Sequence, residues 1–96
     1  MPVIHEIDPS ALSGSAGQKI RIRATDDCGL AKVTVQLLDP AEKVLESGEA
    51  VLGANRSPDW EYTTQVSLSP GQEISIQAVA YDRAGNKAIA KAAKQI

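Results

Sequence analysis

Strict alternation of apolar and polar residues is the clearest pattern along this chain, and it is sharpest over residues 73–81. The even-numbered residues of this segment are Ile, Ile, Ala and Ala, while most of the odd-numbered ones are polar. A period of two predicts a β-strand with one buried face. Pro70-Gly71 precedes the segment, and 82–86 (Asp-Arg-Ala-Gly-Asn) follow it. Both flanks are typical of turns, because these residue types tolerate turn backbone angles or hydrogen-bond their own main chain.

The same alternation recurs in other parts of the chain, and each recurrence predicts a strand. These segments are 3–7, 19–25, 32–38 and 60–68. Their apolar faces should meet between two sheets. The predicted core consists of Ile20, Ile22, Val33, Val35, Leu37, Trp60, Tyr62, Ile74, Ile76 and Ala78.

The segment 40–47 carries both helical and strand signals. Asp39, Pro40 and Glu42 are suited to the cap, the first position and the first turn of a helix. Such a helix would have about two turns, which is marginal without packing. We favour short strands at 43–46 and 49–52 around a turn at Ser47-Gly48.

The segment 87–95 is rich in alanine and would also suit a helix. Gly85-Asn86 before it is a hairpin signal, however, and the strand 73–81 needs a neighbour. Lysines at 87, 91 and 94 would protect an exposed sheet edge. We therefore predict that 87–95 is the last strand.

About seven short strands, separated by Gly, Pro, Asp, Asn and Ser clusters, predict an all-β fold. The spacing is typical of an immunoglobulin-like β-sandwich of antiparallel strands in two sheets, and it excludes the strand-helix rhythm of α/β proteins. A length of 96 residues fits one domain, 1–96. The pattern begins and ends with the chain, as expected of a module excised from a longer protein.

Charge and composition exclude several classes of function. The formal net charge is −2 and both signs are spread along the chain, so no clustered basic face predicts nucleic-acid binding. No apolar run approaches transmembrane length, and no signal peptide is recognisable in this segment. Cys28 is the only cysteine, so an intramolecular disulfide is excluded.

Three segments resemble the bacterial immunoglobulin-like domains of the early-set kind, with some likeness to fibronectin type III modules. They are ATDDCGLAKVTVQLLD at 24–39, the Trp-Glu-Tyr strand at 60–62 and LSPGQEISIQAVAYDRAGN at 68–86. The chain departs from fibronectin modules at Ile74, where those place a tyrosine. The resemblance implies a module of a secreted or cell-surface bacterial protein.

Four polar residues form the candidate metal site of the sequence: Asp26, Asp27, Asp82 and Asn86. The loops that hold them should share one end of the sandwich. Their oxygens could bind calcium, which takes six to eight oxygen ligands. The alternative, which we favour, is that these residues cap turns through hydrogen bonds to the backbone.

Two other groups of side chains could bind a ligand. Trp60, Tyr62 and Tyr81 could form an aromatic platform for sugars, but alternation places the first two in the core. Lys19, Arg21 and Arg23 form a basic row, for which Glu61 on a neighbouring strand and solvent are the simpler partners. The row is therefore expected to be a charged surface.

The remaining reactive residues do not form a catalytic or zinc-binding set. His5 has no second histidine to share a metal, and two acids precede Cys28, which disfavours a reactive thiolate. No Ser-His-Asp or Cys-His arrangement can be placed. We therefore expect a protein that is not an enzyme.

Together these observations predict a non-catalytic structural or interaction module, acting as a spacer or in adhesion. The alternative is a carbohydrate-binding accessory module of an extracellular enzyme. The expected partners are neighbouring domains of the same parent chain, other surface proteins or glycans. No cofactor is expected, and calcium at 26, 27, 82 and 86 is the one metal that these residues could bind.

Overall fold

The alternating segments become eight β-strands in the computed structural model, which describes residues 2–26, 30–52 and 59–96. No helix occurs within these ranges, and so none that could span a membrane. The strands are β1 (Val3–Asp8), β2 (Lys19–Thr25), β3 (Leu30–Leu38), β4 (Val44–Glu49), β5 (Val51–Leu52), β6 (Asp59–Thr63), β7 (Glu73–Asp82) and β8 (Lys87–Gln95).

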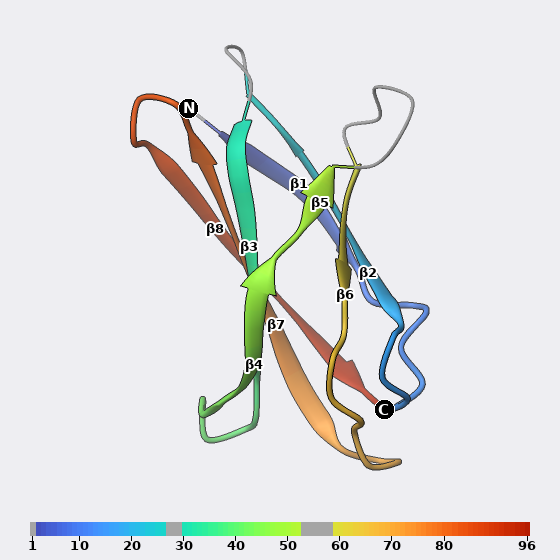
Figure 1. Cartoon of the computed structure of the whole chain (residues 1–96). Helices are drawn as coiled ribbons and strands as arrows, with labels where there is room; N and C mark the ends of the chain where they lie inside the picture. The colour runs from blue at the N-terminus through green and yellow to red at the C-terminus, as the bar shows by residue number, and fades with distance from the viewer. Residues whose placement is uncertain (1, 27–29, 53–58) are drawn as a thin grey trace.

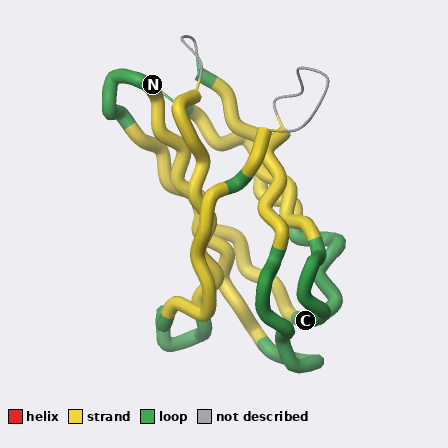
Figure 2. The backbone as a smooth tube through the Cα atoms, in the orientation of Figure 1, coloured by secondary structure: helices red, strands yellow, loops and turns green. Residues whose placement is uncertain are grey.

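The strands form two four-stranded sheets that pack face to face (Figures 1 and 2). Sheet A has the order β1-β2-β6-β5, and sheet B has the order β4-β3-β7-β8. Every neighbouring pair is antiparallel. The predicted all-β sandwich is therefore confirmed.

The two short strands predicted at 43–46 and 49–52 are present with other bounds, as β4 and β5, and they belong to different sheets. β4 pairs with β3 and runs straight through Ser47-Gly48, so the turn predicted there is wrong. The chain crosses between the sheets at Ala50, whose N–H donates to the Val33 carbonyl oxygen at 2.8 Å. A Cβ at Gly48 would lie 3.0 Å from the Tyr62 ring, so glycine in this strand marks a close approach between the sheets.

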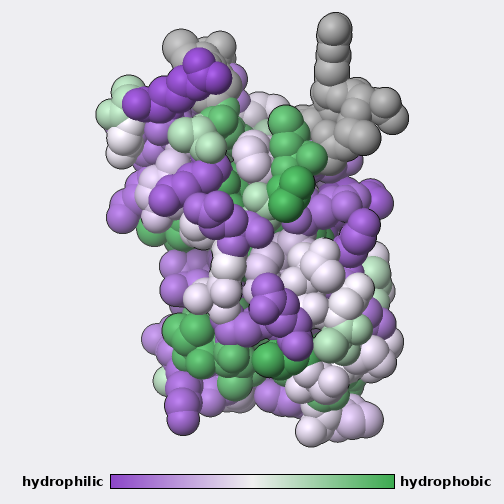
Figure 3. Space-filling model, in the orientation of Figure 1, coloured by the Kyte–Doolittle hydropathy of each residue, from purple (hydrophilic) through white to green (hydrophobic). Residues whose placement is uncertain are grey.

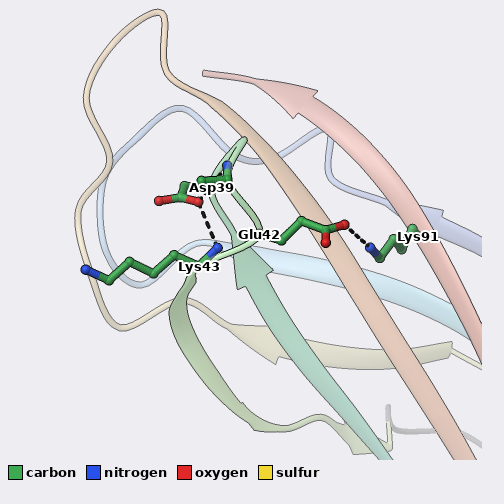
Figure 4. Close-up of polar contacts among 5 residues, drawn as sticks. Asp39, Glu42, Lys43 and Lys91 are labelled. Atoms are coloured by element: carbon green, nitrogen blue, oxygen red, sulfur yellow. Dashed lines mark hydrogen bonds and ion pairs between the residues drawn. The ribbon is translucent and has the colours of Figure 1, made fainter.

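The turn lies instead between β3 and β4, at the residues that suggested a helix (Figure 4). Asp39 Oδ1 accepts the backbone N–H groups of Ala41 at 2.9 Å and Lys43 at 2.8 Å. Glu42 takes a left-handed φ of 64°. Asp39 thus caps a hairpin turn and not the helix that was the alternative for this segment, because β4 continues the pairing.

The core matches the prediction with one exception. Nine of its ten residues are buried, and Trp60 is half-buried against the same cluster. β6 ends at Thr63, five residues earlier than predicted. Regular pairing with β2 stops there because the Gln18 N–H donates to the Thr64 hydroxyl, while the Thr64 carbonyl oxygen accepts the N–H of Gly17. Figure 3 shows apolar patches on the surface over β4 and β5, where Val51 is 71% exposed and Leu52 50%.

Candidate functional site

The β7–β8 turn is organised around the buried carboxylate of Asp82. Its Oδ1 accepts the backbone N–H groups of Ala84 at 2.9 Å and Asn86 at 2.8 Å. Its Oδ2 accepts the side-chain amide of Asn86 at 3.0 Å. These bonds, led by the one from the Asn86 side chain, lower the pKa of Asp82. Asp82 is thus held ionised by the turn that it caps.

The other members of the predicted metal set are less closely joined. Asp26 directly follows β2, and Leu30 at the start of β3 pairs with Asp82, so both acids lie at the same end of the sandwich. Asp27 and the neighbouring Cys28 lie outside the described residues. In the part of the chain that the structure describes, no three His, Cys, Asp or Glu side chains are grouped to hold a metal. A metal at 26, 27, 82 and 86 stays a prediction.

His5 lies on a β-bulge at this same end. Ile4 pairs with Ala24 and Glu6 with Arg23, which leaves His5 as the extra residue of β1. The imidazole is exposed, and its Nε2 lies 2.7 Å from Thr25 Oγ1. Bulges re-aim side chains and are frequent next to functional sites. The bulge therefore makes His5 a candidate ligand-binding residue.

The sequence alone predicts that His5 is an exposed surface residue, because it has no second histidine with which to share a metal. A signal was nevertheless present in the spacing of its neighbours. Ile4 and Ile7 both pack against the core although they are three residues apart, whereas an unbroken strand buries residues at a spacing of two. That break in the period marks the bulge at His5.

A second bulge lies at the same end in the other sheet. Leu30 pairs with Asp82 and Lys32 with Tyr81, so that Ala31 is the extra residue of β3. Both sheets therefore depart from regular pairing around the loops that follow β2 and β7. This end of the sandwich is the candidate functional site.

The three aromatic rings do not form a common platform. Tyr62 is buried in sheet A with Trp60 half-buried beside it in β6, whereas Tyr81 lies on the outer face of sheet B. The Lys32 ammonium lies 4.9 Å from the centre of the Tyr81 ring, a cation–π contact. The prediction that Trp60 and Tyr62 face the core is confirmed.

The basic row of β2 is paired with acids on β6. Lys19 lies 3.1 Å from Glu61, and Arg23 lies 3.2 Å from Asp59. These ion pairs cross between adjacent strands on the outer face of sheet A. The row is a charged surface, as expected, and gives no sign of a site for an acidic polymer.

Comparison with known proteins identifies a structural neighbour. No protein-family model and no curated protein matches the sequence. The fold is similar to the crystal structure of CopC from Methylosinus trichosporium OB3b, with a TM-score of 0.68 and 17% sequence identity. The match covers 99% of this chain and 92% of that one. At this identity the likeness establishes the fold, an immunoglobulin-like β-sandwich.

The comparison corrects three expectations. The spacer or adhesion role, and the carbohydrate-binding alternative, came from a resemblance to modules of surface proteins. The match over nearly the whole of both chains is instead to CopC. The same finding overturns the expectation of no cofactor, with calcium at most. The motifs misled because they describe turns and strands of the sandwich and carry no information on ligands.

Proposed function

We propose that this chain is a copper-binding β-sandwich protein of the CopC kind, acting by binding and not by catalysis. The observation that carries the proposal is the fold match over 99% of this chain and 92% of CopC. A match of that extent includes both sheets and their connections. We also place the protein outside the cytoplasm, in a secreted or periplasmic location, as part of the same proposal.

His5 is the residue that we expect to bind the metal. Copper(II) favours imidazole nitrogen together with oxygen ligands in tetragonal geometry. The chain has one histidine, and its imidazole is exposed on the bulge of β1 beside Thr25. Copper bound to this protein should therefore have one imidazole ligand.

The described residues do not form a complete copper site. Across residues 2–26, 30–52 and 59–96 no group of three metal-binding side chains is present. Asp82, at the same end, already accepts three hydrogen bonds from its own turn. The described part of the chain thus provides one nitrogen donor, His5, and no group of further side chains that would complete a copper site around it.

Calorimetric titration of metal-free protein with copper(II) tests the proposal. We expect saturable binding of one copper ion per chain, and a loss of at least about tenfold in affinity in His5→Asn. Thr25→Val is the matched control, because it removes the hydroxyl that contacts His5 and keeps the imidazole. Absence of saturable copper binding would contradict the proposed function. Binding that is equal in His5→Asn and the parent would contradict the role of His5.

A further inference from the structure

β8 is the edge strand of sheet B. It spans nine residues, and β7 is its one hydrogen-bonded neighbour among the described strands (Figure 1). An edge strand of this length presents a row of backbone N–H and C=O groups on which another strand can pair. The side chains beside these backbone groups decide which strand could pair there.

Two hydrogen bonds at the ends of β8 fix which backbone groups face outward. The N–H of Asp82 donates to the Asn86 carbonyl oxygen at 3.0 Å, and the N–H of Ile96 donates to that of Gln72 at 2.8 Å. The pairing between these points has no register shift. In an antiparallel pair, hydrogen-bonded and non-hydrogen-bonded residues alternate. The even-numbered residues of β8 therefore bond to β7, and the odd-numbered ones direct their N–H and C=O groups away from β7. No described strand bonds to this edge, although β1 of sheet A lies close to β8.

The side chains of the odd-numbered residues give this edge a distinct pattern. Lys87 and Lys91 are exposed on the outer face of the sheet, and Ile89 between them is 54% exposed. Their partners on β7 are Tyr81, Val79 and Gln77, none of which is acidic. Along this edge, a cation, an apolar residue and a second cation therefore follow one another.

The lysines of β8 differ from the cations of sheet A in their ion-pair partners. Lys19 and Arg23 of β2 face acids on the adjacent strand β6. Lys91 has instead a single ion pair of 3.1 Å with Glu42, which reaches it from the β3–β4 turn (Figure 4). No ion pair is formed by Lys87 within the described part of the chain. Positive charge is therefore available along β8.

We propose that the free edge of β8 binds an extended acidic segment of a partner protein, which adds to sheet B as a fifth strand. The segment places acidic residues opposite Lys87 and Lys91 and an apolar residue opposite Ile89. Backbone hydrogen bonds supply affinity in this mode, and the alternate side chains supply specificity. A second copy of β8, paired antiparallel about Ile89, would set Lys87 against Lys91, and like charges directly opposite are destabilising. The edge therefore favours an acidic strand over its own copy in that register.

Glu42 acts as an internal competitor for such a segment. Its side chain is 76% exposed, and its backbone has the left-handed φ of 64° that glycine favours. It reaches Lys91 from the β7 side, over the outer face of sheet B, so it competes for the charge of Lys91 and not for the place of a strand at the edge (Figure 4). Replacing this carboxylate should therefore strengthen binding of the partner segment.

The proposal is tested with a fluorescent peptide of seven residues, Thr-Glu-Thr-Val-Thr-Glu-Thr, blocked at both ends, and the full chain at low salt. Fluorescence anisotropy should show saturable binding that weakens as salt is added. Binding should be at least about tenfold weaker in Lys87→Gln/Lys91→Gln and about two- to fivefold tighter in Glu42→Gln. Lys19→Gln on sheet A is the control and should bind as the parent does.

The backbone contribution is tested on the peptide, so that the protein stays unaltered. Methylation of the Val amide nitrogen, which would face β8, should abolish binding, whereas methylation of the adjacent Thr amide should spare it. The inference fails if a peptide with Gln in place of both Glu binds equally well, or if both methylated peptides behave alike. It also fails if sedimentation shows that the chain pairs with its own copy through β8.

Discussion

The Tyr62 hydroxyl donates a 2.5 Å hydrogen bond to the Glu46 carboxylate, and this bond joins the two sheets. Tyr62 belongs to β6 of sheet A, and Glu46 belongs to β4 of sheet B. The same carboxylate accepts the backbone N–H of Gln65 at 3.0 Å, just beyond the end of β6. The Glu46 side chain thus binds both the Tyr62 phenol and the backbone that follows β6.

Tyr62→Phe should lower the stability of the fold. The substitution keeps the ring in the core and removes the hydroxyl that Glu46 accepts. Because hydrogen bonds to charged groups contribute about 1.5–3 kcal/mol, we expect a loss of roughly that size in the free energy of unfolding. Urea unfolding of the parent and the variant measures it, and equal midpoints at equal slopes would contradict the role of the bond.

Tyr62 should also make the fold sensitive to alkali. Burial, and then the hydrogen bond to Glu46, raise the pKa of Tyr62 above its usual value of 10.0. The folded state therefore retains this proton more strongly than the unfolded state does. The contribution is complete below pH 10 and is lost as the pH rises from 10 toward the raised pKa. The difference in stability between the parent and Tyr62→Phe should shrink above pH 10, as followed by chemical unfolding; a constant difference would refute the assignment.

The contribution of Asp82 to the stability of the fold should depend on pH in the opposite sense. Its hydrogen bonds within the β7–β8 turn lower its pKa from 3.8, so its contribution is present above pH 3.8 and is lost as the pH falls below that value. Asp82→Ala should lower the urea midpoint at pH 7. Asp82→Asn is the control, because it keeps an acceptor for the turn and should remove the dependence on acid. If Asp82→Ala unfolds at the parent midpoint, the turn does not depend on this carboxylate.

Buried and exposed isoleucines should respond very differently to truncation. Ile76 is fully buried between the sheets, whereas Ile89 is 54% exposed on the outer face of β8. Ile76→Ala should cost about 2–5 kcal/mol, since it removes buried methylene groups and leaves a cavity. Ile89→Ala should change the stability by about 0.5 kcal/mol or less. Thermal unfolding compares the two variants. Similar losses of stability would show that the assignment of inward-facing and outward-facing residues is wrong.

Alternation predicted the core and most strands because it depends on which residues face inward. It placed Ile20, Val35 and Ile76 correctly without knowledge of their partners. It could not predict that β4 and β5 belong to different sheets, because that depends on distant pairing with β3 and β6. For the same reason the turn was placed at Ser47-Gly48, although pairing continues through Gly48 and Asp39 caps the turn instead.

The candidate site could be predicted only in part. The Asp82–Asn86 turn followed from residue types that bond to their own backbone. The bulge at His5 depends on how β1 pairs with β2, and Glu46 contacts Tyr62 across the two sheets. Both relationships join residues far apart in the sequence. Motifs of strands and turns recur in many sandwiches, which is why they indicated the fold and misjudged the function.

Electron paramagnetic resonance of the protein with one equivalent of copper(II) tests the central claim most directly. We expect a tetragonal copper signal whose nitrogen couplings include those of one imidazole, because the chain has one histidine. The imidazole couplings should disappear in His5→Asn and persist in Thr25→Val. A spectrum identical to that of copper in buffer, or one unchanged in His5→Asn, would contradict the proposal that this β-sandwich binds copper through His5.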